Sequence, residues 1–270
     1  MREPAKGKTI VLIPARLKAT RLPGKPLADI HGAPMIVHVW RRAVAAGLGP
    51  VVVACEDQAI ADAVRAAGGT AELTGAQHRS GSDRIFEALQ RLDPAGTYSV
   101  VVNLQGDLPN IEPEVIAAVV EPLHNPSVKI GTIVRRLEEG ELAAHSVVKA
   151  HARFKTEERV AVATGFTRDD HNCNHHCWHH IGIYAYRRAA LERFVHLKPS
   201  ANEQKHSLEQ LRAMDDGMVI GVRRVDTDSF GVDTPADLER ARAVLAPPTR
   251  HIARPITRHM KPKRGISGSR

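Results

Sequence analysis

Short apolar runs alternate with segments of helical periodicity through the first half of this 270-residue chain, and this alternation constrains the fold most. The first run, residues 9–13, ends at Pro14, as expected of a strand buried on both faces of a sheet. Further strands are predicted at 50–55, 71–74 and 98–104, and helices at 34–46, 57–67 and 82–92. The β-α-β order predicts an α/β fold: a doubly wound, mostly parallel sheet with helices on both faces.

The second half of the chain is less regular and predicts a smaller, mixed α+β portion. Strands are expected at 128–135, 159–163, 181–186 and 218–225, and helices at 188–195, 203–215 and 235–246. One folded domain is therefore predicted over residues 9–246. Residues 1–8 are interpreted as a short N-terminal extension.

The last stretch, residues 247–270, holds seven of the basic residues and no acidic one. Removing it lowers the net charge from +8 to about +1, so the basic character belongs to a tail that we expect to be disordered. The three cysteines are sparse and odd in number, which favours a reducing compartment. With no leader-like segment and no apolar run near the ~20 residues of a bilayer span, the expectation is a cytoplasmic protein without a membrane segment.

The loop at 14–27 follows the first predicted strand and carries four positive charges, on Arg16, Lys18, Arg21 and Lys25. Ligands of open α/β sheets bind outside the carboxyl ends of the strands. Clustered cations and closely approaching backbone amides suit a nucleoside triphosphate. A solvated basic loop is the alternative on charge alone, and the loop has no GxxxxGK[ST] pattern.

Two aspartates at element ends are candidate Mg²⁺ ligands. Asp107 closes the string NLQGD after the fourth predicted strand, and Asp233 lies in GVDTPADL before the last helix. Mg²⁺ prefers one or two carboxylates together with phosphate oxygens. The structural alternatives are a turn capped by Asp107 and a helix N-cap at Asp233.

The full string at 14–27, PARLKATRLPGKPL, resembles the first loop of nucleotidyltransferases that make sugar nucleotides. More narrowly, it resembles the 3-deoxy-manno-octulosonate (Kdo) cytidylyltransferases, or CMP-Kdo synthetases. HRSGSDR at 78–84, HHIGIYAY at 179–186 and LEQLR at 208–212 follow in the family's order. The resemblance covers about residues 10–245.

The resemblance implies a nucleotide-diphospho-sugar transferase-like, Rossmann-like fold. It also implies a Mg²⁺-dependent homodimer that converts CTP and Kdo to CMP-Kdo and pyrophosphate for lipopolysaccharide biosynthesis. The resemblance assigns residues 9–125 to the nucleotide half and residues 126–225 to the sugar-binding and dimerisation part. Residues 226–246 are the segment that brings a metal-binding residue back to the nucleotide half. No membrane and no specific nucleic acid is expected as a partner.

Site residues are implied in the same way. Phosphate contacts are expected from Arg16, Arg21 and Lys25. Nucleotide contacts are expected from Pro14, Ala15, Cys55, Glu56, Ser80 and Arg84. Sugar contacts are expected from Gln105, Arg168, His180, Tyr184, Glu209 and Gln210. The metal ligands are expected to be Asp107 and Asp233.

Departures from the family pattern lie mainly in the sugar half. Residues 144–149 read AHSVVK in place of an Asn-rich turn, and GFTR at 165–168 has no Pro-Trp after it. On our alignment His206 replaces a glutamate, and ACE at 54–56 replaces the usual ATD. The alternatives are the same chemistry on 8-amino-Kdo or a sialic acid, a weakened or inactive paralogue, and a nucleic-acid-binding protein built on an inactive transferase fold.

Residues 171–180 combine Cys173 and Cys177 with several histidines, which suggests a tetrahedral zinc site. Spacing this dense offers many equivalent sets of ligands. The preferred interpretation is a variable, partly exposed loop, with His180 as a sugar contact.

Overall fold

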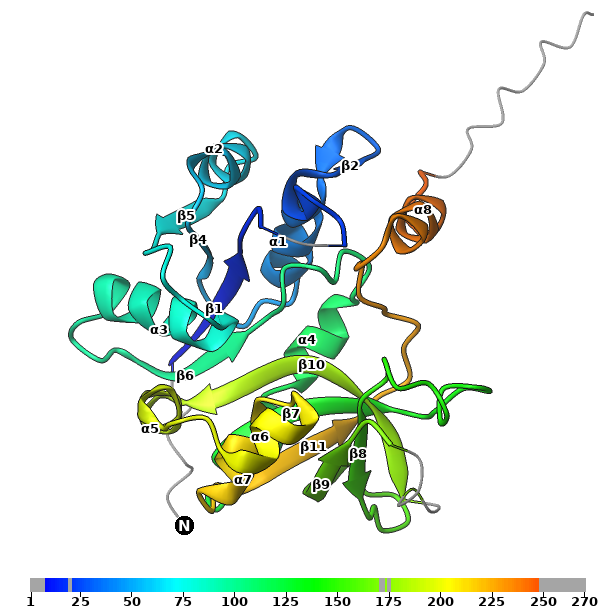
Figure 1. The fold of residues 1–270 in the computed structure, drawn as a ribbon. Helices are drawn as coiled ribbons and strands as arrows, with labels where there is room; N and C mark the ends of the chain where they lie inside the picture. The colour runs from blue at the N-terminus through cyan, green and yellow to red at the C-terminus, as the bar shows by residue number, and fades with distance from the viewer. Residues whose placement is uncertain (1–7, 19–20, 170–172, 174–175, 248–270) are drawn as a thin grey trace, which may run out of the picture.

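A nine-stranded sheet organises the computed structural model of the chain, which describes residues 8–18, 21–169, 173 and 176–247 (Figure 1). The strand order is β5-β4-β1-β6-β10-β7-β11-β9-β8. The strands are β1 (Lys8–Ala15), β4 (Val51–Cys55), β5 (Thr70–Leu73), β6 (Tyr98–Asn103), β7 (Ile130–Arg135), β8 (Lys149–Ala152), β9 (Val160–Thr167), β10 (Cys177–Arg187) and β11 (Ile220–Arg224). A separate hairpin joins β2 (Asp29–Ile30) to β3 (Ala33–Pro34).

Helices cover both faces of this sheet. They are α1 (Met35–Ala45), α2 (Gln58–Ala66), α3 (Gly81–Leu92), α4 (Pro113–Ala118), α5 (Arg188–His196), α6 (Ala201–His206), α7 (Gln210–Asp215) and α8 (Pro235–Val244), with short 3₁₀ turns at Lys25–Leu27 and Glu121–His124. Val11 and Ile13 of β1 pack in one core cluster with α1, α2 and α4. Ile10 and Leu12 pack in a second cluster with α3, α5 and α7. A strand buried on both faces has to be apolar throughout, and the predicted doubly wound α/β class is confirmed.

Strand β10 reverses direction in the middle of the sheet. β1, β4, β5 and β6 are parallel to one another, whereas β10 is antiparallel to both β6 and β7. β10 also pairs with β8, β7 with β11, β11 with β9 and β9 with β8. These five strands therefore close into a ring, and β10 belongs to both the ring and the open sheet. We call β7, β8, β9, β10 and β11 the strand ring.

Several expectations were wrong in the second half. The helix expected over 203–215 is two helices, because Ser207 adopts a left-handed conformation (φ 53°) between α6 and α7. The variable loop expected over 171–180 ends earlier, since β10 begins at Cys177. Strand β8 and helix α4 were not predicted at all. Both are short, and β8 (KAHA) lacks branched residues and forms because it pairs on both sides.

Two of the three cysteines are paired, although the sequence suggested no disulfide. Cys173 and Cys177 form a disulfide, while Cys55 is fully buried at the end of β4, as expected of a small core side chain. Residues 1–7 and the basic tail from residue 248 onward, expected to be disordered, lie outside the described residues. Within the described ranges, none of the helices combines the length and apolar character needed to cross a bilayer.

Glu141 stabilises the ring through a network with β7 and β10. Its carboxylate accepts hydrogen bonds from Arg135 (2.6 and 3.0 Å), the Glu138 amide (2.8 Å) and His179 Nδ1 (2.9 Å). Burial alone would raise the pKa of Glu141, but these bonds outweigh it and lower the pKa from 4.5 to about 2. Its contribution to stability is thus present above pH 4.5 and is lost as the pH falls toward 2.

We therefore expect Glu141→Gln to lower the melting temperature at pH 7, with the gap from the native protein narrowing below pH 4.5. Thermal unfolding followed by circular dichroism between pH 7 and pH 3 measures this. Glu138→Gln is the control, because Glu138 also pairs with Arg135 but its side chain is 62% exposed. A gap for Glu141→Gln that stays constant with pH would contradict the assignment.

Candidate functional site

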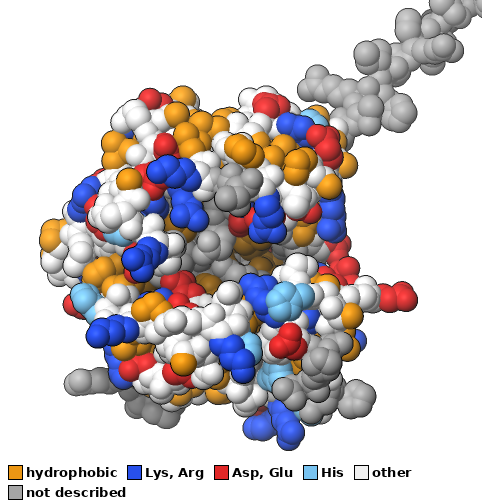
Figure 2. Space-filling model, viewed as in Figure 1, with side chains coloured by type: hydrophobic (Ala, Val, Ile, Leu, Met, Phe, Trp, Pro, Cys, Tyr) orange, Lys and Arg blue, Asp and Glu red, His pale blue; other side chains and the backbone are white. Residues whose placement is uncertain are grey.

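A cavity of about 350 Å³ opens where β1 and β6 end, lined by the loops that follow these strands, the start of α3 and Asp233. In the space-filling view this face is hollowed, and Lys and Arg side chains gather around the hollow (Figure 2). Ten of the predicted site residues line it: Pro14, Ala15, Arg16, Arg21, Lys25, Ser80, Arg84, Gln105, Asp107 and Asp233. Segments as distant in sequence as the first loop and the last helix therefore meet at one place.

The basic loop after β1 is held by its own backbone. Gly24 adopts a left-handed conformation (φ 69°) and donates its amide to the Leu17 carbonyl at 3.2 Å. Leu17 in turn donates its amide to Asp57 Oδ2 at 3.0 Å. The 3₁₀ turn at Lys25–Leu27 follows directly, so the loop returns Lys25 to the cavity. Residues 19 and 20 of this loop lie outside the described residues.

Lys25 bridges the two aspartates expected to bind metal. Its Nζ lies 2.9 Å from Asp107 Oδ2 and 3.0 Å from Asp233 Oδ1, and Arg21 adds a 3.0 Å contact to Asp233 Oδ2. Burial alone would lower the pKa of Lys25, but the two carboxylates outweigh it and raise the pKa above its ordinary value of 10.5. One full positive charge is therefore held between two carboxylates.

Asp233 is available for this contact because its neighbours cap the last helix. Thr234 is the N-cap of α8, and its side chain accepts from the Asp237 amide at 3.2 Å. In return, the Asp237 carboxylate accepts hydrogen bonds from the amides of Asp233 and Thr234 at 3.1 and 2.9 Å. The N-cap alternative for Asp233 is therefore wrong. The Val232 amide also donates to the Asp107 carbonyl at 2.9 Å, which brings the two aspartate loops together.

Two glycines let three segments crowd around Pro14. A Cβ on Gly106 would lie 2.9 Å from the Pro14 carbonyl oxygen, and a Cβ on Gly81 would lie 3.0 Å from Pro14 Cγ. Both distances are at or below the closest approach of real side chains. These positions thus allow the QGD loop and the start of α3 to close the cavity wall.

Helix α3 presents its N-terminus to the cavity through Ser80 and Gly81. The Ser80 hydroxyl accepts from the Asp83 amide at 3.2 Å and so caps the helix. The 12-residue helix directs its positive dipole end toward the cavity. His78 and Arg79 line the same wall, together with Lys18, Leu22 and Pro26 from the basic loop. Lys18 was predicted as one of the cations of the basic loop, whereas the other four side chains were not named as site residues, although the strings HRSGSDR and PARLKATRLPGKPL contain them.

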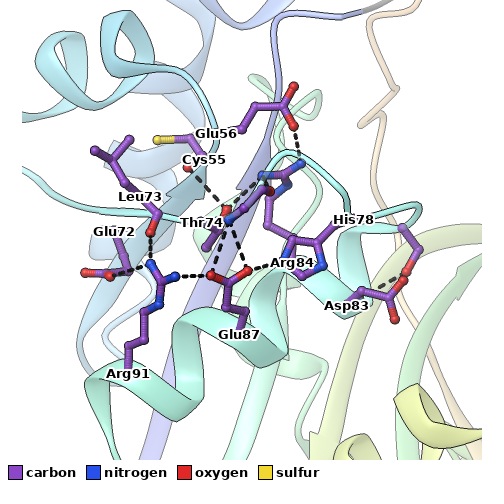
Figure 3. Close-up of polar contacts among 12 residues, drawn as sticks. Cys55, Glu56, Glu72, Leu73, Thr74, His78, Asp83, Arg84, Glu87 and Arg91 are labelled. Carbon is purple, nitrogen blue, oxygen red and sulfur yellow. Dashed lines mark hydrogen bonds and ion pairs between the residues drawn. The ribbon is translucent and has the colours of Figure 1, made fainter.

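Arg84 lines the cavity, and its guanidinium is held by hydrogen bonds to neighbouring groups of the protein (Figure 3). Its guanidinium donates to Thr74 Oγ1 (2.7 Å), the Gly75 carbonyl (3.2 Å) and Glu56 Oε2 (2.6 Å), and the residue is 2% exposed. Nearby, Glu87 pairs with both His78 and Arg91. The structure therefore gives Arg84 and Glu56 a supporting position in the cavity wall.

Cys55 does not line the cavity, although it was expected to contact the nucleotide. Its side chain belongs to the hydrophobic core on the α1–α2 face of the sheet, and burial raises its thiol pKa to about 11. Its carbonyl accepts hydrogen bonds from the Thr74 amide at 2.8 Å and the Thr74 hydroxyl at 3.2 Å.

Two predicted sugar residues lie on β10, beside the strand ring's interior. His180 is buried, and its Nε2 lies 2.9 Å from the Thr132 hydroxyl. Its ring contacts the rings of Phe166 and Tyr184. Burial lowers the pKa of His180 to about 3 and raises that of Tyr184 well above 10. Both side chains are therefore neutral at physiological pH.

Glu209 and Gln210 lie at the start of α7, where a second cavity of about 620 Å³ includes Glu209, Arg79 and Ser80 in its lining. Ser82 donates to Glu209 Oε2 at 3.1 Å, which joins the predicted sugar side to α3. Glu209 Oε1 and Gln210 Nε2 are buried and, within the described part of the chain, have no hydrogen-bond partner, although Glu209 Oε1 lies 3.8 Å from Arg212 Nη2. A buried polar atom without a hydrogen bond costs free energy, and at Glu209, which lines the second cavity, it is typical of a site for a polar ligand.

Arg168 lines neither cavity, but it is hydrogen-bonded to Ser207, which lines the second one. It donates to the carbonyls of His145 (3.2 Å), Ser146 (3.4 Å) and Ser207 (3.5 Å). The fully buried Lys149 holds the Arg168 carbonyl at 2.8 Å and the Ala144 carbonyl at the same distance. The stretch that departs from the family pattern is thus anchored to Arg168 through its backbone.

A doubly wound sheet with a basic first loop and a cavity that gathers two aspartates from other loops defines a nucleotidyltransferase of the sugar-nucleotide class. The Cytidylyltransferase family model matches residues 10–220. A curated 3-deoxy-manno-octulosonate cytidylyltransferase from Paramagnetospirillum magneticum is 54% identical over 239 residues, covering 87% of this chain and 97% of its own. One from Azorhizobium caulinodans is 57% identical over 88% of this chain and 95% of its own. The chain belongs to the 3-deoxy-manno-octulosonate cytidylyltransferase family.

Solved structures agree with this assignment. A CMP:2-keto-3-deoxy-manno-octonic acid synthetase complexed with CTP is 38% identical, covers 88% of this chain and 98% of its own, and has a TM-score of 0.79. A UDP-glucose pyrophosphorylase complexed with UDP-glucose is 12% identical with a TM-score of 0.61 over 87% of this chain and 97% of its own. The second similarity shows the fold alone.

The supporting position of Arg84 predicts a stability defect. Arg84→Ala leaves Glu56 buried and unpaired, so we expect the free energy of unfolding to fall by about 3 kcal/mol. Urea unfolding followed by fluorescence measures the loss. Arg91→Ala on the same helix is the control: that side chain is 50% exposed, and its ion pairs should be worth about 1 kcal/mol or less. Equal losses in the two variants would contradict the supporting role.

Proposed function

We propose that this protein transfers CMP from CTP to the anomeric hydroxyl of Kdo and releases pyrophosphate, supplying CMP-Kdo for lipopolysaccharide biosynthesis. The bridge from Lys25 to Asp107 and Asp233 is the observation that carries the proposal. It places two carboxylates and a lysine in a cavity that arginines and a helix N-terminus also line. The curated relatives named 3-deoxy-manno-octulosonate cytidylyltransferase provide independent support.

Mg²⁺ is the proposed cofactor, with Asp107 and Asp233 as its protein ligands. Their carboxylates already converge on one cationic group, Lys25 Nζ, and a hard divalent cation prefers such oxygen donors. When bound there, the ion would neutralise charge on the attacking and leaving oxygens of the transfer. The donor set fits this cation.

The remaining cavity residues bind and orient the nucleotide in this proposal. Arg16 and Arg21 neutralise the phosphates, and Lys25 exchanges its carboxylate partners for phosphate oxygens as pyrophosphate leaves. Pro14, Ala15 and Ser80 form the wall against the nucleotide. Such positioning supplies much of the catalysis in phosphoryl transfer, since the protein adds little covalent chemistry.

The sugar acid is proposed to bind across Gln105, Arg168, His180, Tyr184, Glu209 and Gln210. Arg168 offers a guanidinium fork for the sugar carboxylate. Neutral His180 and Tyr184, together with Glu209 Oε1 and Gln210 Nε2, which have no hydrogen-bond partner among the described residues, offer hydrogen bonds to hydroxyls. A panel of Kdo, 8-amino-Kdo and a sialic acid at fixed CTP would separate the alternatives. Turnover on none of them would favour an inactive paralogue.

Homodimerisation, a cytoplasmic location and the division into nucleotide, sugar and return segments at residues 125 and 225 are further proposals. The dimer and the division into segments rest on the sequence resemblance, and the location rests on the sparse, odd set of cysteines. Light scattering after size exclusion measures the mass of the particle in solution, and a monomer would overturn the proposed dimer.

Removing either metal ligand should abolish most turnover. We expect Asp107→Asn and Asp233→Asn each to lower kcat about 100-fold or more, while CTP binding partly survives. Pyrophosphate release with CTP and Kdo measures turnover, and calorimetry measures binding. EDTA should stop the native enzyme, and Mg²⁺ should restore it. Glu239→Gln on α8, 69% exposed, is the control. Turnover near the native level in either aspartate variant would overturn the assignment.

Changing the sugar side should separate the two substrates kinetically. Glu209→Gln retains the shape of the side chain but loses the charge, so we expect KM for Kdo to rise about 10- to 100-fold. KM for CTP should stay within about twofold, because Glu209 does not line the nucleotide cavity. Glu192→Gln, exposed on α5, is the matched control. Equal changes in both KM values would contradict a sugar contact.

A further inference from the structure

A histidine and two cysteines meet at the place where the strand ring closes. Cys177, the first residue of β10, stands opposite His151 of β8 in the antiparallel register. Residues paired in this way point to the same side of the sheet. Ala150 and Ala152, which alternate with His151, are 0% and 1% exposed and belong to the hydrophobic core. His151 and Cys177 therefore share the opposite face.

Cys173 completes the group, since it lies four residues before Cys177 and is joined to it by the disulfide. His151 offers a ring nitrogen, and all three ligand atoms lie within 4.8 Å of one another. His151 Nε2 is buried and, among the described residues, has no hydrogen-bond partner. A buried nitrogen lone pair or N–H without a partner is costly, so this atom is available to a ligand at this place.

The chemistry of the three groups selects the ligand. Two thiolates and an imidazole are soft and borderline donors, which favour Zn²⁺ over Mg²⁺ or Ca²⁺. Zn²⁺ takes four ligands in tetrahedral geometry, so a water molecule can fill the remaining position. A disulfide has no thiolate to offer, so the cross-linked pair and the metal-bound pair are alternative states of the same two sulfurs.

We propose that the reduced protein binds one Zn²⁺ through His151 Nε2, Cys173 Sγ and Cys177 Sγ. A phosphine with water cleaves the S–S bond to two thiols and becomes a phosphine oxide. Zn²⁺ then replaces the two thiol protons, which are released to solvent. The site is separate from the catalytic cavity, because none of its three residues lines either cavity. The bound Zn²⁺ would hold β8 against β10 at Cys177, three residues before His180. The zinc site does not depend on the proposed reaction.

Cobalt is the first probe, because Co²⁺ substitutes for Zn²⁺ and reports thiolate ligation in its absorption spectrum. The full-length protein is treated with tris(2-carboxyethyl)phosphine until a denatured sample of it titrates for three thiols, and is then freed of metal by chelation. We expect one equivalent of Co²⁺ to produce tetrahedral d–d bands and a thiolate-to-cobalt charge-transfer band. Zn²⁺ should displace the cobalt, since Zn²⁺ binds such sites more tightly than Co²⁺.

Single substitutions then test each ligand. Cys173→Ser and Cys177→Ser should each weaken Zn²⁺ binding by at least about 100-fold in a competition with a chromophoric chelator. His151→Ala should retain the charge-transfer band and alter the d–d bands. Cys55→Ala is the matched thiol control and should leave the affinity unchanged, because Cys55 is buried elsewhere in the core. Circular dichroism establishes that each variant is folded.

Two results would overturn the proposal. One is a reduced protein that binds Co²⁺ without a thiolate band, or with an affinity equal to that of the Cys173→Ser/Cys177→Ser double variant. The other is a pair that stays oxidised in excess phosphine, because such a pair has no metal-binding state. Neither result depends on pyrophosphate release, so a failure of the proposed zinc site is distinguishable from a failure of the proposed function.

Discussion

The ion bridge from Lys25 to Asp107 and Asp233 is the constraint on which the site depends. It joins the first loop, the turn after β6 and the approach to α8, which are more than 200 residues apart at the extremes. Two carboxylates brought this close repel each other, and a cation between them is needed to hold them. Lys25 supplies that cation, so the cavity is assembled before any ligand arrives.

The fold gives this bridge its place. β1 and β6 are parallel neighbours, so their carboxyl ends carry the basic loop and the QGD turn to the same edge. Gly106 and Gly81 then allow both segments to pack on Pro14. α8 is not followed by a strand in the described part of the chain. It is held in place by Val232 and Leu238, which pack with Ile30 and Met35. Each of these contacts joins only two or three segments, and together they shape one cavity.

Sequence reasoning predicted the first half of the fold well, because strands buried on both faces consist of continuous apolar runs such as residues 9–13. Through the resemblance to the family, it also named ten residues that line one cavity of the structure. It failed where tertiary pairing decides the structure. β8 has weak strand propensity and exists through its two neighbours, and Ser207 breaks a helix that periodicity favoured. Cys55 lies in a motif position at the end of a buried strand, and its side chain packs in the core, as expected there, and does not line the cavity.

The departures of the sugar half are best understood through backbone contacts. Residues 144–149 differ in sequence from the family pattern, but buried Lys149 still links the carbonyls of Ala144 and Arg168. A lysine ammonium binds carbonyls whatever side chains they carry, so the turn can change its side chains without releasing Arg168. β10 works in the same way, since its ladder with β7 and β8 orients His180 independently of the loop before it. The altered segments therefore border a proposed sugar site whose supporting backbone is in place.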